Sequence, residues 1–192
     1  MPYISPAFCP GFNLSQGYRY LRGMSKRALK KYVSEVPKKE LQKQVLDLYE
    51  RFPVVKKYYD FVFNPKEEAM IREAKSRIGN EYFPLRRNKP RARRSVAQRY
   101  IKQFRKLEMD PAWIAELMVF NLETALAYEE GHRASEAFYR SMLNSFTEVL
   151  HYVTLNRLMP DFRDRIKSIY QKVQQRNWLN AESFSSALEA LD

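Results

Sequence analysis

Glycine and cysteine are scarce in this 192-residue sequence. Five glycines are too few for a turn-rich β-sandwich, and the single cysteine, Cys9, cannot form an internal disulfide. A protein without internal disulfides suits a reducing compartment, so we expect a cytoplasmic location. No apolar run approaches the roughly 18 residues that a membrane-spanning helix needs. We therefore expect no membrane partner, and nothing in the sequence indicates the oligomeric state.

The first 23 residues differ from the rest of the chain. They are rich in proline, glycine, tyrosine and phenylalanine, they lack helical periodicity, and their prolines interrupt any apolar stretch of a secretory signal. Helical sequence begins after Met24, where Ser25 suits an N-cap. We expect residues 1–23 to be an irregular extension, or the product of a start placed too early, and residues 24–192 to form a single α-helical domain.

The sequence after Met24 carries repeated signals for helix starts and stops. Asn64-Pro65-Lys66-Glu67 predicts a capped helix start, and Gly79-Asn80 predicts the end of that helix. Asp110-Pro111 predicts another start, followed by a segment, 111–130, that is apolar nearly all round and hence typical of a central helix. No strand-like alternation is present. The sequence predicts an all-α, single-domain helical bundle or short helix-pair array of about seven or eight helices.

Charge is distributed unevenly along the chain, whose net charge is +12. Residues 81–107 contain ten basic residues and one acidic residue, and no acidic residue lies between Glu81 and Glu108. Residues 108–192 contain thirteen acidic and eight basic residues. A basic first half and a mildly acidic second half favour an anionic partner for the first half, although the two halves can also neutralise each other.

The basic segment divides into a loop and a helix with two different faces. The predicted apolar face consists of Val96, Ala97, Tyr100, Ile101, Phe104 and Leu107. The face predicted to lie opposite consists of Arg91, Arg94, Gln98, Lys102 and Arg105. This pattern predicts a core helix that carries a basic stripe on its outer side.

Basic side chains in such a row neutralise phosphates, and arginine binds them with two hydrogen bonds. We therefore predict that residues 86–106 engage an anionic partner such as nucleic acid. An acidic protein surface is the alternative, and a merely solvated face is the simplest interpretation. The residues predicted to bind are Arg91, Arg93, Arg94, Lys102 and Arg105, with Arg86, Arg87 and Lys89 as a loop clamp.

Two Glu-x-x-His patterns raise a remote alternative, a carboxylate–histidine metal site in a helix bundle. They are Glu129 to His132 and Glu148 to His151, and Glu116 or Glu123 could add carboxylates. Gly131 places the first pattern at a helix end, and matching spacing without context is weak. We therefore predict no metal site, with Glu148 and His151 as the remote candidates.

Motifs for catalysis are missing from the sequence. There is no glycine-rich phosphate loop and no Gly-x-Ser-x-Gly turn, and Cys9 lies in the irregular extension. We expect a binding protein without catalytic residues or a cofactor.

The segments that can be compared with known families are 24–32, 48–59 with Asn64-Pro65, 95–113 and 136–141. They resemble a family of bacterial proteins known only as a domain of unknown function. The resemblance extends over nearly everything from Met24 onward and leaves residues 1–23 outside. It implies an all-helical fold and a cytoplasmic bacterial protein, and it brings no catalytic motif.

Overall fold

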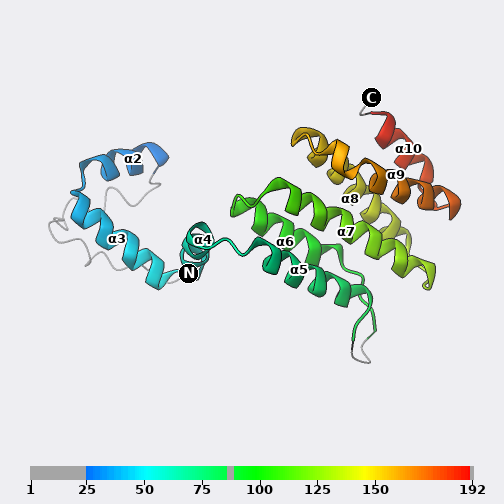
Figure 1. Ribbon diagram of the computed structural model, residues 1–192, viewed down its shortest axis with the longest axis horizontal. Coiled ribbons are helices and arrows are strands. Elements are labelled where there is room, and N and C mark those ends of the chain that lie inside the picture. The colour runs from blue at the N-terminus through cyan, green and yellow to red at the C-terminus, as the bar shows by residue number, and fades with distance from the viewer. Residues whose placement is uncertain (1–24, 86–88, 191–192) are drawn as a thin grey trace. The chain divides into compact units, whose positions relative to one another are not determined.

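The computed structural model describes residues 25–85 and 89–190, so residues 1–23 and the predicted clamp residues Arg86 and Arg87 lie outside the described part. The described residues form nine α-helices and no strand (Figure 1), which confirms the all-α prediction. None of these helices is long and apolar enough to span a bilayer. Contacts along the chain group it into two compact units, one ending at Asp60 and one formed by Phe61–Asp192. The single domain over 24–192 stays a prediction.

Three helices that begin in the first unit are separated by prolines. Ser25 caps the first of them, as predicted, because its side chain accepts a hydrogen bond from the backbone N–H of Ala28 at 3.2 Å. No residue of the three helices is buried, although each has an apolar face. The helices are α2 (Lys26–Glu35), α3 (Lys38–Arg51) and α4 (Pro53–Phe63).

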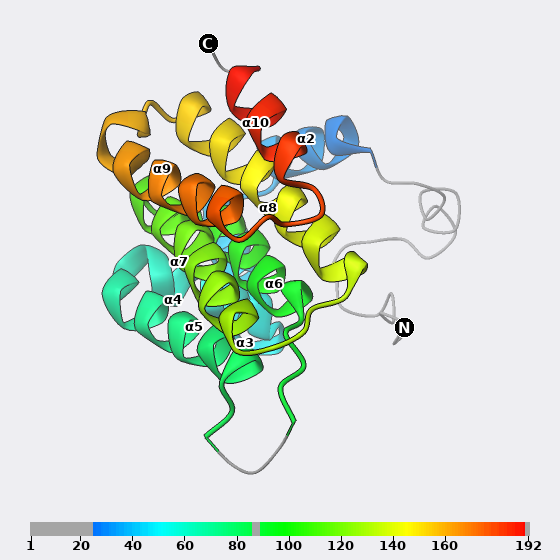
Figure 2. The same ribbon diagram turned by 90° about the vertical axis from the view of Figure 1, so that its right-hand side faces the viewer.

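The second unit is built around one long helix. Its helices are α5 (Glu67–Tyr82), α6 (Arg94–Lys106), α7 (Pro111–Glu130), α8 (Glu136–Leu155), α9 (Met159–Gln175) and α10 (Ala181–Glu189). Figures 1 and 2 show α7 between α5 and α6 on one side and α8 and α9 on the other, and it packs against all four. Asp110 caps α7, as predicted, by accepting the backbone N–H of Ala112 at 2.8 Å. The prediction that 111–130 forms the central helix is confirmed.

The cap predicted at Asn64–Glu67 for the start of α5 is wrong. The helix begins at Glu67 and its N-cap is Lys66, without a side-chain capping bond. The carboxylate of Glu67 instead accepts a hydrogen bond from the backbone N–H of Asp110 at 3.1 Å. Glu67 therefore links the start of α5 to the start of α7, and the local capping box is replaced by a tertiary contact.

The predicted end of α5 is also wrong, because the helix continues through Gly79 to Tyr82. The Tyr82 side chain is fully buried, and its hydroxyl donates to Oδ1 of Asn121, which is itself buried on α7, at 3.2 Å. Burial raises the pKa of Tyr82, so its hydroxyl remains a donor. Burying an aromatic side chain stabilises by about 1.5–3 kcal/mol, which outweighs the roughly 1 kcal/mol that a glycine costs in a helix.

Replacing Tyr82 with phenylalanine should lower the free energy of unfolding by about 1–2 kcal/mol, because Asn121 would lose its partner in a buried site. Chemical denaturation would measure this loss. The double variant Tyr82→Phe/Asn121→Leu should recover most of the stability, since it leaves no unpaired polar group. A double variant no more stable than Tyr82→Phe would contradict this account.

Candidate anion-binding face

Helix α6 packs one side against α5 and α7. Ala97, Ile101 and Phe104 are buried on that side, and Leu107 follows them as the buried C-cap. These are members of the predicted apolar face, so the core-facing side of α6 is confirmed. The position of its basic residues differs from the prediction.

The predicted basic stripe is in large part a contact with α8. Arg94 donates from Nε to Oγ of Ser145 at 2.7 Å and forms an ion pair with Glu148. Gln98 donates to the other oxygen of Glu148 at 2.8 Å. Arg94 and Gln98 therefore do not lie opposite the apolar face, because they occupy the flank of α6 that contacts α8.

Arg105 extends the same contact along α8 to Tyr152, about one turn beyond Glu148. Its guanidinium lies 4.7 Å from the ring centroid of Tyr152, and its Nη2 lies 3.9 Å from the sulfur of Met118. Burial raises the pKa of Tyr152, and the charge of Arg105 opposes that rise. We call the whole contact the α6–α8 seam, formed by Arg94, Gln98 and Arg105 with Ser145, Glu148 and Tyr152.

The loop before α6 is anchored at the end of α5. Arg93 holds Glu81 with two parallel hydrogen bonds of 2.8 and 2.9 Å, and these bonds lower the pKa of Glu81. The carbonyl of Glu81 also accepts the backbone N–H groups of Arg91 and Ala92 at 3.0 and 2.9 Å. Arg93 therefore positions the loop, while the side chains of Arg91 and Lys89 are exposed.

Three cations form the outer edge of α6. Arg99, Lys102 and Lys106 are exposed, and none of them forms an ion pair with the rest of the described chain. Arg99 lies 5.6 Å from the ring centroid of its neighbour Tyr100. We call Arg99, Lys102 and Lys106 the outward row. Only Lys102 was among the predicted binding residues.

The outward row could have been found from the sequence. At 100° per residue, Arg99, Lys102 and Lys106 point away from the mean direction of Ala97, Ile101 and Phe104. Arg94 and Arg105, the stripe arginines within α6, lie roughly 50–75° from that direction, at the border between core and solvent. Long basic side chains at such borders reach neighbouring helices.

The side chains considered as remote metal ligands either contact other residues or are exposed. Glu148 pairs with Arg94, and His151 is exposed on α8. His132 stacks on a tyrosine ring with centroids 4.2 Å apart, and Glu129 pairs with an arginine at the end of α9. Across residues 25–85 and 89–190, no three histidine, cysteine or acidic side chains are grouped as metal ligands would be.

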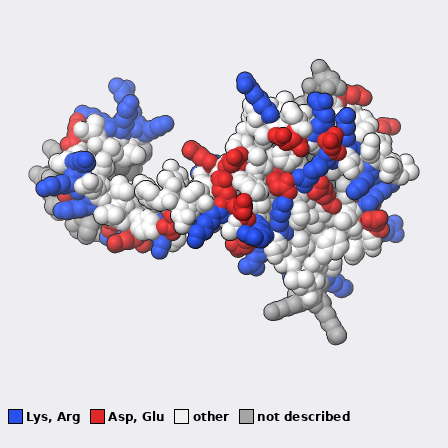
Figure 3. Space-filling model, viewed as in Figure 1, with Lys and Arg blue, Asp and Glu red and all other residues white. Residues whose placement is uncertain are grey.

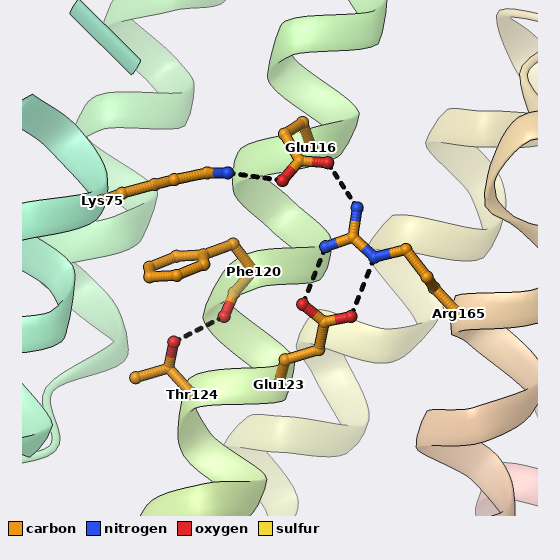
Figure 4. Close-up of polar contacts among 6 residues, drawn as sticks. All are labelled: Lys75, Glu116, Phe120, Glu123, Thr124 and Arg165. Atoms are coloured by element: carbon orange, nitrogen blue, oxygen red, sulfur yellow. Dashed lines mark hydrogen bonds and ion pairs between the residues drawn. The ribbon is translucent and has the colours of Figure 1, made fainter. Parts of the chain in front are cut away.

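Glu116 and Glu123 belong to a charged cluster that joins three helices (Figure 4). Arg165 of α9 binds Glu123 through two hydrogen bonds of 2.8 and 2.7 Å and also contacts Glu116, which Lys75 of α5 binds from the other side at 2.5 Å. Burial would raise the pKa of Glu116, but the bonds from Arg165 and Lys75 outweigh it and lower the pKa. Figure 3 shows acidic and basic side chains interspersed on the visible face of the second unit. The cluster pairs charges inside the fold and leaves none for a ligand.

No curated protein and no solved structure matches the chain. The sequence profile of the Family of unknown function (DUF6155) matches residues 24–192, in agreement with the resemblance found from Met24 onward. The chain belongs to this family.

Proposed function

We propose that the protein binds an anionic polymer, nucleic acid, through the outward row of α6 together with Lys89 and Arg91. The observation that carries the proposal is that the outward row is exposed and unpaired within the described chain, in a segment without acidic residues between Glu81 and Glu108. The other predicted binding arginines within the described residues, Arg93, Arg94 and Arg105, contact other side chains of the chain. We therefore expect them to contribute less to nucleic-acid binding than the outward row does.

The arrangement of charge favours a polymer over a small anion. Residues three and four apart on a helix lie about 5–6 Å from each other, so the outward row offers successive cations along one line. Such a line suits repeated phosphates, whose neutralisation releases counterions and gives strong salt dependence. The row is a surface feature, and a cleft of about 430 Å³ in the second unit lies elsewhere, beside Trp113 and the start of α5.

The test compares two charge-reversal variants of identical composition. The first changes the outward row, as Arg99→Glu/Lys102→Glu/Lys106→Glu. The matched control is Arg163→Glu/Lys167→Glu/Lys172→Glu on α9, which reverses one arginine and two lysines that are also exposed and unpaired within the described chain. Fluorescence anisotropy with labelled single- and double-stranded DNA and RNA, at two salt concentrations, measures binding.

We expect wild type to bind with an affinity that falls steeply as salt rises. The outward-row variant should bind about 10–100-fold more weakly, with a salt slope smaller by about 2–3 because each lost phosphate contact removes about one. The control should keep most of the affinity. Equal losses of affinity in both variants would mean that binding depends on net charge and not on the outward row. No binding of wild type at low salt would overturn the proposal and favour an acidic protein partner.

A further inference from the structure

Helices α2 and α3 carry an apolar surface that the described chain does not cover. Its five members are between 37 % and 49 % exposed, and neither helix has a buried residue. We call this surface the apolar seam. It consists of Leu29, Tyr32 and Val33 on α2, and Leu48 and Phe52 at the end of α3.

Two short helices with such a surface need something to pack against. Isolated helices shorter than about 12–15 residues are marginal in water, and helices in proteins owe most of their stability to a packed apolar face. Helix α2 has 10 residues and α3 has 14. The two helices are tied by a hydrogen bond of 2.7 Å from Gln44 to the hydroxyl of Tyr32. A third helix on the seam would complete a small bundle.

The charges around the seam identify the chemistry of that helix. Residues 26–43 contain seven basic and two acidic residues, and both acidic residues are already paired, Glu35 with Lys31 at 3.9 Å and Glu40 with Lys43 at 3.6 Å. Figure 3 shows lysine and arginine side chains gathered over α2 and the first turn of α3. Five cations remain without an ion pair in the described part of the chain: Lys26, Arg27, Lys30, Lys38 and Lys39.

Three occupants can be compared. A second copy of the chain, paired through the same seam, would bring two cationic surfaces together, which is unfavourable. An anionic bilayer suits helices whose apolar side chains stand free, whereas those of the seam are already about half covered. An acidic amphipathic helix matches both the half-covered apolar surface and the surplus of positive charge.

We propose that the apolar seam docks an acidic amphipathic helix of a partner protein. The helix would place its apolar residues on Leu29, Val33 and Leu48 and its carboxylates beside the unpaired lysines. This surface is distinct from the outward row of α6, so the two proposals stand or fall separately.

The test uses the full chain and three designed peptides of 18 residues. The first has leucine at heptad positions a and d and glutamate on its other faces. The second has lysine in place of glutamate, and the third has the composition of the first in an order without an apolar face. The seam variant is Leu29→Gln/Leu48→Gln, and the matched control is Leu155→Gln/Leu179→Gln, two leucines that are exposed in the second unit.

Anisotropy of the labelled peptides should show the leucine–glutamate peptide binding at least 10-fold more tightly than either other peptide. The seam variant should lose at least 10-fold in affinity and the control should lose less than 2-fold. Amide hydrogen exchange without peptide should show the same protection of residues 26–52 in wild type and both variants, which shows that these helices form. Peptide binding should add protection there in wild type and in the control, which locates the contact.

Other outcomes would overturn the proposal. Equal binding of the acidic peptide and its reordered version would mean that charge alone acts. Co-sedimentation with phosphatidylglycerol vesicles that Leu29→Gln/Leu48→Gln abolishes would assign the seam to lipid. A dimer in sedimentation experiments that the same variant dissociates would assign it to a second copy, and failure of all three peptides to bind would leave the seam without this partner.

Discussion

Replacing Arg165 with methionine should lower the free energy of unfolding by about 2–3 kcal/mol, a decrease of roughly 5–10 °C in melting temperature for a chain of this size. Arg165 bonds both oxygens of Glu123 and one of Glu116, and its side chain is 33 % exposed. Methionine keeps much of the packing but leaves Glu116 with Lys75 alone. Because the cluster is partly exposed, the loss should be smaller than the 3–5 kcal/mol typical of a broken buried pair.

The matched control for this prediction is Arg163→Met on the same helix, where the exposed arginine has no ion pair within the described residues. It should change stability by less than about 0.5 kcal/mol. The lowered pKa of Glu116 adds a pH signature: its contribution is present above the ordinary value of 4.5 and is lost as the pH falls through the lowered pKa. The gap between wild type and Arg165→Met should therefore be full at pH 7 and shrink below pH 4.5. Equal losses in the two variants would contradict the role of the cluster.

Much of the fold was predictable because its signals are local. Ser25 and Asp110 cap helices in the structure as their sequence context predicts, since an N-cap needs only a side-chain oxygen and its own next turn. The central position of 111–130 followed from its apolar character on all sides. These features depend on residues close to each other in the chain.

The two errors at α5 came from contacts between distant residues. The sequence predicted a local cap formed by Asn64 to Glu67, but the Glu67 carboxylate binds the backbone of Asp110, which is 43 residues away. Gly79 was predicted to end the helix, but Tyr82 continues it because its ring and hydroxyl are buried against α7. A local propensity of about 1 kcal/mol cannot compete with such burial, and a single sequence does not reveal the partner.

The basic face illustrates a second limit. The sequence located the cationic segment and its apolar side, but charge alone does not tell an arginine that pairs within the fold from one that is free. Glu148, the partner of Arg94, lies 54 residues further along the chain. Arg99 and Lys106 were passed over although their helical positions point outward. The candidate site therefore follows from helical geometry combined with the ion pairs, and neither is sufficient alone.

Reversing the charge of Arg94 should lower the free energy of unfolding by about 2 kcal/mol. Arg94→Glu removes charge-assisted hydrogen bonds to Ser145 and Glu148, worth about 1.5–3 kcal/mol each before allowance for exposure, and places like charges together. Two effects reduce the loss. Glu148 is 44 % exposed, so solvent screens it, and a glutamate at the first position of α6 gains about 0.3–1 kcal/mol from the helix dipole.

Arg99→Glu is the matched control, because it makes the same charge change on the same helix in the outward row. Denaturant unfolding should show it within about 0.5 kcal/mol of wild type. The exchange variant Arg94→Glu/Glu148→Arg should regain about half of the stability lost in Arg94→Glu, since the pair is restored with reversed sign while the bond to Ser145 is not. If Arg94→Glu proves as stable as Arg99→Glu, the α6–α8 seam does not hold these helices together, and Arg94 returns to the set of cations free to bind an anionic partner.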